Sequence, residues 1–158
     1  MPIGGNKKDL YIGVIGAGQC NPEIEFLAEQ VGSAIAKEGA ILVCGGLGGV
    51  MKAAAKGAKS AGGRTLGILP GDDKNKANEY IDIAVATGIG EARNIVIIKT
   101  ADAVVALPGR YGTLSEMAFC MKIGRPLVSL SDWDISEEIE RFTDPVKAVK
   151  RAVQLAGE

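Results

Sequence analysis

The stretch at residues 107–116 (LPGRYGTLSE) contains the residue types of a ligand-binding corner. It follows the apolar run 103–107, which predicts a buried strand, and it leads into apolar residues at helical spacing, Leu114 and Met117 among them. Glycines let a backbone approach a ligand closely, and the N-terminus of the following helix carries free N–H groups and partial positive charge. We therefore expect an anion here. The residues that we assign to it are Gly109, Arg110, Tyr111, Gly112 and Thr113.

Thr113 and Glu116 in the same stretch also have a purely structural interpretation. Their spacing is that of a capping box, in which a Thr side chain caps the N-terminus of a helix and a Glu reaches back to the amide of the cap residue. Under this interpretation Glu116 only begins a helix. These residues taken alone leave open whether Glu116 has that role or belongs to a ligand site.

Two further glycine-rich loops follow predicted strands, at residues 16–18 (GAG) and 45–49 (GGLGG). In a parallel sheet the carboxyl ends of the strands open on one edge, where ligands bind. All three loops should therefore lie on the same rim. A ligand with phosphate or sugar groups explains them better than three unrelated turns do. The residues that we assign to the ligand from these two loops are Gly16, Ala17, Gly18, Gly45, Gly46 and Gly48.

The residue types present argue against several common kinds of site. A dinucleotide fingerprint needs a glycine where Asn21 stands and an acidic residue where Cys44 stands. The sequence has no glycine-lysine-Ser/Thr triplet for a P-loop and no histidine for Ser-His, Cys-His or HExxH chemistry. Three separated cysteines, Cys20, Cys44 and Cys120, suggest small buried side chains rather than disulfides or a zinc cluster, so no metal is expected. Acid–base chemistry must come from carboxylates, Lys, Tyr or water.

Length and composition indicate one globular domain. The chain has 158 residues, of which 47% are hydrophobic and 23% charged, enough for one well-buried core and too few for two ordinary domains. A net charge of -1 lacks the basic excess typical of nucleic-acid partners, so none is expected. No signal peptide or membrane span is evident, which predicts a cytoplasmic protein. Residues 1–9 are predicted to form a flexible leader, and residues 10–158 a single domain.

Short apolar runs alternate with helical patterns along the chain. Strands are predicted at residues 11–15, 40–44, 64–69, 81–86, 103–107 and 127–130. Helices are predicted after the Asn21–Pro22 cap, at about 50–61, at 91–100, from Glu116, and after Asp144–Pro145, with a further capping box at Asp134 and Glu137. This alternation predicts an α/β fold, a Rossmann-like doubly wound parallel sheet with helices on both faces. The polar segment 72–79 is expected to be a mobile loop over the site.

Arg93-Asn94, followed by residues 101–116 (ADAVVALPGRYGTLSE), resembles the signature of the LOG-like family. These lysine-decarboxylase-like Rossmann proteins share a PGGxGTxxE motif and include cytokinin-activating nucleoside 5'-monophosphate phosphoribohydrolases. The short chain, the early Gly-Ala-Gly turn and the Ala-Arg-Asn sequence are closer to the branch that contains the molybdenum-cofactor carrier protein. The resemblance covers nearly the whole chain in element order and implies a Rossmann-like fold.

The resemblance also implies roles for individual residues. The family's glycine-rich motif binds the substrate phosphate, its essential glutamate corresponds to Glu116, and its essential arginine corresponds to Arg93. Arg110 stands where the hydrolases usually have the second glycine of the motif, and Asn94 where they commonly have lysine. An arginine at position 110 either adds a phosphate contact or fills space that a substrate needs, which favours binding over hydrolysis. A homodimer or homotetramer is implied because the family commonly buries helices between subunits.

Two functions are expected on these grounds. The first is binding of a phosphorylated nucleotide-like ligand, a nucleoside monophosphate or a molybdopterin-type cofactor, with no other cofactor required. The alternative is a phosphoribohydrolase that cleaves the N-glycosidic bond between a base and ribose 5'-phosphate. That reaction passes through a cation-like sugar, which Glu116 would stabilise while Arg93 positions the substrate or keeps Glu116 ionised. A regulatory nucleotide sensor is a third and less favoured class.

Overall fold

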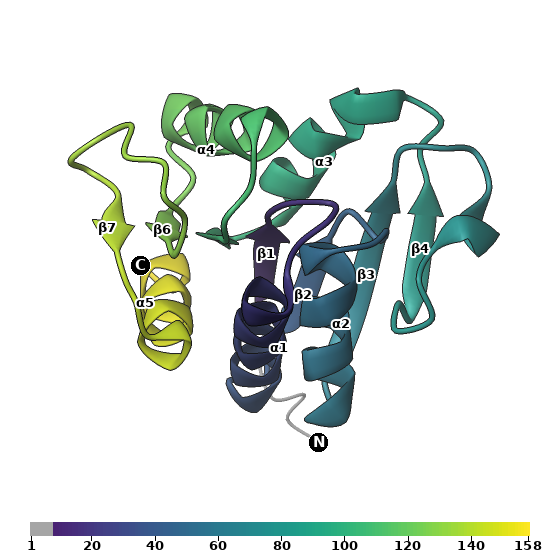
Figure 1. Cartoon of the computed structure of the whole chain (residues 1–158), viewed down its shortest axis with the longest axis horizontal. Coiled ribbons are helices and arrows are strands. Elements are labelled where there is room, and N and C mark those ends of the chain that lie inside the picture. Colours follow the sequence, from purple (N-terminus) through teal and green to yellow (C-terminus); the bar gives the residue numbers. More distant parts are fainter. Residues whose placement is uncertain (1–7) are drawn as a thin grey trace, which may run out of the picture.

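A single parallel sheet forms the centre of the molecule. In the computed structural model, which describes residues 8–158, seven strands follow the order β4-β3-β2-β1-β5-β6-β7 (Figure 1). All neighbouring pairs are parallel. The strands are β1 (Tyr11–Ile15), β2 (Ile41–Cys44), β3 (Arg64–Leu69), β4 (Ile83–Ala86), β5 (Ala103–Ala106), β6 (Leu127–Ser129) and β7 (Glu140–Arg141). The predicted Rossmann-like α/β fold is confirmed.

Helices cover both faces of this sheet (Figure 1). On one face lie α1 (Pro22–Lys37), α2 (Val50–Ser60) and α5 (Pro145–Ala156), which share a core with alternate residues of the central strands. On the other lie α3 (Arg93–Thr100) and α4 (Tyr111–Ile123), preceded by the short 3-10 helices η1 (Lys74–Lys76) and η2 (Gly90–Ala92). Because β1, β2, β5 and β6 are buried on both sides, their sequences are almost continuously apolar.

The order of the strands reverses beside β1. The chain proceeds from β1 through β2 and β3 to β4 and then returns to place β5 on the other side of β1. Such a switch point leaves a crevice outside the carboxyl ends of the two strands. Here it brings the loop after β1 against the loop after β5, and the Ala17 amide donates a hydrogen bond to the Pro108 carbonyl at 3.1 Å.

Helices α1 and α2 pack closely because two glycines have no side chain between them. A Cβ on Gly32 would overlap the Ala54 carbonyl, and one on Gly57 would overlap the Glu29 carbonyl. The start of α1 matches its predicted cap, since Asn21 Oδ1 accepts a hydrogen bond from the Ile24 amide at 2.9 Å. The start of α1 is thus set by its local cap, whereas its position against α2 is set by tertiary packing.

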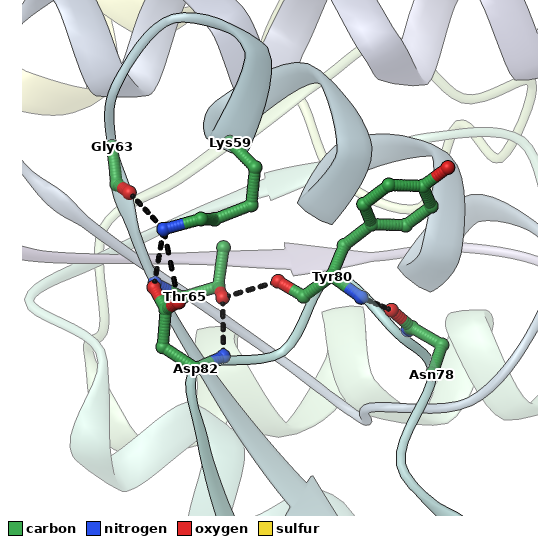
Figure 2. A network of polar contacts seen from close by, with 6 residues as sticks. All are labelled: Lys59, Gly63, Thr65, Asn78, Tyr80 and Asp82. Carbon is green, nitrogen blue, oxygen red and sulfur yellow. Dashed lines mark hydrogen bonds and ion pairs between the residues drawn. The ribbon is translucent and has the colours of Figure 1, made fainter.

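The segment before β4 is held by a polar network (Figure 2). Asp82 accepts hydrogen bonds from the Thr65 amide at 3.0 Å and from Lys59 Nζ at 3.0 Å. Thr65 Oγ1 donates to the Tyr80 carbonyl at 2.6 Å and accepts from the Asp82 amide at 2.8 Å. Lys59 Nζ also donates to the Gly63 carbonyl at 3.0 Å. The network therefore joins α2, β3 and the entry to β4.

Neither of the two capping boxes considered from the sequence is present in the described chain. Helix α4 begins at Tyr111, so Thr113 and Glu116 lie inside its first turns, and the cap position belongs to Arg110, whose side chain makes no capping hydrogen bond. No helix begins at Asp134 in the described chain, and the segment between β6 and β7 is irregular. Strand β7 was not predicted because its two residues are charged and exposed, so they carry no apolar signal.

The burial predicted for the three cysteines is confirmed for two of them. Cys44 and Cys120 are buried, but Cys20 is only partly buried at the start of α1. Of the expected leader, residues 1–7 lie outside the described part, and Asp9 forms an ion pair with Arg64 at 2.9 Å. No helix within residues 8–158 is both long and apolar enough to cross a membrane.

Candidate functional site

A cavity of about 560 Å³ lies at the switch point between β1 and β5. Its walls come from the loop after β1 and from the start of α4, and the residues that line it are Gly16, Ala17, Gly18, Gln19, Arg110, Gly112 and Thr113. The first amides of α4 have no acceptor within the helix and point outward from its positive end. Arg110 is exposed beside them. Backbone N–H groups and one guanidinium therefore meet in a cavity suited to an anion.

Gly109 shapes this cavity without lining it. A Cβ at Gly109 would overlap Thr113 Oγ1 and lie 3.0 Å from the Ala17 amide nitrogen, so only glycine lets the loops after β1 and β5 meet. The Gly109 carbonyl accepts a hydrogen bond from Trp133 Nε1 at 2.9 Å. Tyr111 is 78% exposed, and its ring centre lies 6.0 Å from that of Trp133. Trp133 and Gln19 were not predicted; Gln19 directly follows the Gly-Ala-Gly turn, but no local signal marks Trp133.

The glycine loop after β2 supports the loop after β1. Gly49 has φ +60°, and a Cβ there would overlap the Ala17 carbonyl, which instead accepts a hydrogen bond from the Val50 amide at 2.9 Å. Asn78 holds the loop after β2 from the other side. Its backbone N–H donates a hydrogen bond to the Gly46 carbonyl at 2.9 Å, and its side-chain Nδ2 donates one to the Leu47 carbonyl at 2.8 Å. The segment 72–79 is thus fastened at Asn78. The expected ligand residues Gly45, Gly46 and Gly48 do not line the 560 Å³ cavity.

Arg93 and Glu116, each 9% exposed, lie near enough on the α3–α4 face for the charge of each to act on the pKa of the other. Arg93 Nη1 donates to the Ile68 carbonyl at 2.8 Å, and Arg93 Nε is buried without a partner among the described residues. Burial raises the pKa of Glu116 to about 7, although the charge of Arg93 acts in the opposite direction. Burial also lowers the pKa of Arg93, against the charge of Glu116. The site therefore holds an acid that exchanges a proton near neutral pH beside a buried guanidinium.

A second cavity of about 300 Å³ lies between α3 and α4. Glu116, Glu91 and Asn94 supply its polar groups, while Ile95, Ile98 and Phe119 supply apolar walls. Gly112 lines both cavities, so the two adjoin at the start of α4. One is glycine-walled and cationic, and the other is partly apolar with a protonatable acid.

A family model extends over nearly all of this structure. The model of the SLOG cluster4 family matches residues 9–156. The chain belongs to the SLOG cluster4 family. The predicted membership of a LOG-like family is therefore confirmed, and the PGRYGTLSE stretch at the cavity is this member's form of the motif.

Two proteins are similar to this SLOG cluster4 protein in sequence over most of its length. An uncharacterised protein of Archaeoglobus fulgidus is 44% identical over 146 residues, covering 92% of this chain and 96% of the relative. A cytokinin riboside 5'-monophosphate phosphoribohydrolase of Mycobacterium tuberculosis is 33% identical over 127 residues, covering 74% of this chain and 67% of the relative.

Solved structures similar to this SLOG cluster4 protein include two with names that refer to the molybdenum cofactor. The molybdenum cofactor binding protein of Rippkaea orientalis superposes with a TM-score of 0.88 and 34% identity, covering 94% of this chain and 98% of that one. The molybdenum cofactor carrier protein of Chlamydomonas reinhardtii superposes with a TM-score of 0.85 and 30% identity, covering 96% and 100%. The chain is thus similar both to cofactor-binding proteins and to a hydrolase.

Proposed function

We propose that this protein binds a phosphorylated ligand that carries a planar heterocycle, either a nucleotide or a molybdopterin-type cofactor. The observation that carries the proposal is the cavity at the switch point, where glycine backbone, the start of α4 and Arg110 converge. Helix N-termini and guanidinium groups are well matched to phosphate oxygens. The adjoining cavity beside Glu116 has apolar walls for a ring and polar groups for its edge. The proteins named for the molybdenum cofactor support this class of ligand.

The proposed residues fit the phosphate of such a cofactor better than they fit a bare ring. Gly18 and Gly112 have no atom within 4 Å of where a Cβ would lie, so the backbone is open to a bound group at both positions. Arg110 and Thr113 supply a charged donor and a hydroxyl from the same side. Gly16 and Ala17 line the same cavity. Gly109 and Tyr111 do not line it, and they join the proposed phosphate-binding set as neighbours of Arg110 in the loop after β5. A molybdopterin-type group would be held here by its phosphate, with its ring toward the second cavity.

Calorimetric titration with guanosine 5'-monophosphate and with guanosine tests the proposal. The monophosphate should bind at least tenfold more tightly, because only it carries the charge that the first cavity recognises. Arg110→Ala should remove most of that difference, whereas Lys122→Ala, an exposed lysine in the last turn of the same helix, should not. Equal affinity for the two compounds would refute phosphate recognition. Native mass spectrometry of the purified protein would identify any ligand that it carries.

A phosphoribohydrolase activity is the second candidate, and the buried Glu116 favours it. A nucleoside monophosphate with its phosphate in the first cavity and its base in the second would pass Gly112 and bring its glycosidic bond toward Glu116. The ionised carboxylate would stabilise a cation-like sugar and orient water. Arg93 lines neither cavity, so it would act by holding Glu116 charged. The named relative from Mycobacterium tuberculosis supports this chemistry.

Chromatography of nucleoside monophosphates incubated with the protein separates the two candidates. Release of free base that is lost in Glu116→Gln would support hydrolysis. Binding without base release, in wild type and in Glu116→Gln alike, would support the carrier function. Arg110→Gly restores the glycine of the family motif, and we expect it to raise any hydrolysis if the arginine side chain fills space that the substrate needs.

The partner is further proposed to be a second copy of the chain. Apolar side chains are exposed on the α3 side of the molecule, with Ile83 64%, Val85 41% and Ile95 43% accessible. Ile83 and Val85 pair with Leu66 and Ile68, which places them on the face that α3 covers only in part. A homodimer or homotetramer would bury these side chains. Native mass spectrometry should then report an oligomer that dissociates in Val85→Asp, and a wild-type monomer would refute it.

A further inference from the structure

We infer that Gly45 is a positioning residue for Arg93. The inference rests on the proposed function, in which Arg93 acts on the ligand site through Glu116. Gly45 directly follows β2, and a Cβ there would overlap Arg93 Nη1 and lie 2.7 Å from Arg93 Cζ. The bare Cα of Gly45 therefore provides the space in which the guanidinium lies.

The backbone does not explain a glycine at this position. Gly46 and Gly49, in the same loop, have positive φ angles that favour glycine, and Gly45 does not. Its requirement comes from the neighbouring side chains, which are Arg93 and Met51, the latter with its Sδ 2.5 Å from the position of a Cβ. Both are the far ends of flexible side chains. An alanine can therefore be accommodated by the fold, at the expense of the position of the guanidinium.

Few hydrogen bonds hold the guanidinium of Arg93 in place. Its Nη1 donates to the Ile68 carbonyl at 2.8 Å, on the strand next to β2. Its Nε is buried and has no partner among the described residues. With one side-chain hydrogen bond, the location of the group is set mainly by the surfaces that enclose it, and Gly45 is one of those surfaces. Displacement by a Cβ would take Nη1 from the place in which it reaches Ile68.

The consequence falls on Glu116. The charged and titratable groups here are Arg93 itself, Glu116 and Cys120 from α4, Glu91 from η2, Cys44 from β2, and Arg125, whose charge acts on Cys120. Among them Arg93 is the cation that acts on the Glu116 carboxyl. A change in the distance between the two groups therefore changes the proton affinity of Glu116, and with it the charge that the second cavity presents to a ligand. Gly45, which lines neither cavity, thus adjusts the site through two side chains.

The test is a double-mutant cycle read by the titration of Glu116. Carbon NMR of the labelled side chain would follow its carboxyl in the wild type, Gly45→Ala, Arg93→Met and the double variant, all without ligand. Gly45→Ala should move the midpoint by at least half a pH unit, and it should have no effect in the Arg93→Met background. Gly71→Ala, on the same sheet edge with negative φ and open space at its Cβ, is the matched control and should leave the midpoint unchanged. An unchanged midpoint in Gly45→Ala, or the same movement with and without Arg93, would overturn the inference.

Two additional measurements keep the inference separate from folding and from the proposed function. Arg93→Lys in the Gly45→Ala background keeps the positive charge but removes the guanidinium that the new Cβ meets. It should therefore return the titration midpoint of Glu116 toward the wild-type value. If Gly45→Ala alone does not fold, Gly45→Ala with Arg93→Ala and Met51→Ala should fold, because both side chains that the new Cβ meets are then shortened. Failure of that triple variant would refute the steric argument. Calorimetry with guanosine 5'-monophosphate tests the proposed function separately. If the wild type does not bind this compound, the proposed function is refuted, while the ligand-free titration of Glu116 still decides the role of Gly45.

Discussion

Replacement of Glu116 by glutamine should change the pH dependence of stability in a definite direction. The substitution keeps the shape of the side chain and removes its proton equilibrium. The pKa of Glu116 is raised by burial from its ordinary 4.5 to about 7 in the folded chain, with Arg93 opposing the change. At about 1.4 kcal/mol for each pH unit, that difference corresponds to roughly 3 kcal/mol of folding free energy. Only 9% of the residue is exposed, so water screens the Glu116 carboxyl little.

The sign follows from which state loses the proton first. As the pH rises through 4.5, the unfolded chain releases the proton from Glu116 while the folded chain retains it up to about 7. The contribution of Glu116 to the free energy of unfolding is therefore largest below pH 4.5. It falls between pH 4.5 and about 7 and is constant at higher pH. The glutamine variant has no such window. Relative to the variant, the wild type should lose about 3 kcal/mol of stability between acid and mildly alkaline pH.

Urea unfolding at several pH values between about 4 and 8.5 measures this difference. Glu38→Gln, which removes an exposed carboxyl just after α1, controls for the general loss of one negative charge. A flat difference between wild type and Glu116→Gln would show that burial does not govern this acid. A wild type that gains stability as the pH rises would show instead that Glu116 and Arg93 form a tight ion pair, and the account of the site as a proton-exchanging acid would fail.

Substitutions at three further positions test the scaffold, each by urea unfolding. Gly32→Ala should cost roughly 1–3 kcal/mol because its Cβ meets the α2 backbone, and a neutral result would contradict that contact. Asn21→Ala should cost about 1 kcal/mol by removing the cap of α1, while Asn21→Asp should retain most of it. Burial raises the pKa of Asp82, but its bonds to Lys59 and Thr65 outweigh this and hold the pKa below 3.8. The wild type should thus be more stable than Asp82→Asn at neutral pH, and this difference in stability should fade as the pH falls below 3.8. A difference that persists at pH 2 would contradict this role of Asp82.

Local sequence determined the elements of the central sheet. Residues 11–15 and 64–69 form strands with the predicted bounds, because each is a mainly apolar run that ends at a glycine or a proline. The Asn21–Pro22 cap begins α1 as predicted, since capping depends on neighbours in the chain. At the sheet edges the local signal fails. Strand β4 begins at Ile83, two residues later than expected, and β7 carries no apolar pattern.

The sequence by itself also identified the strand ends at which the 560 Å³ cavity lies, because the crevices of parallel sheets open at those ends whatever the remaining packing. Only the tertiary structure decided what each residue does there. Thr113 and Glu116 have capping-box spacing, yet both are buried within α4. Gly45 belongs to a glycine run expected at the ligand, yet it lies against Arg93 from another helix. The spacing of residues along the chain indicates the periodicity and polarity of an element. The burial of a side chain and the identity of its neighbours are set only when distant segments pack together.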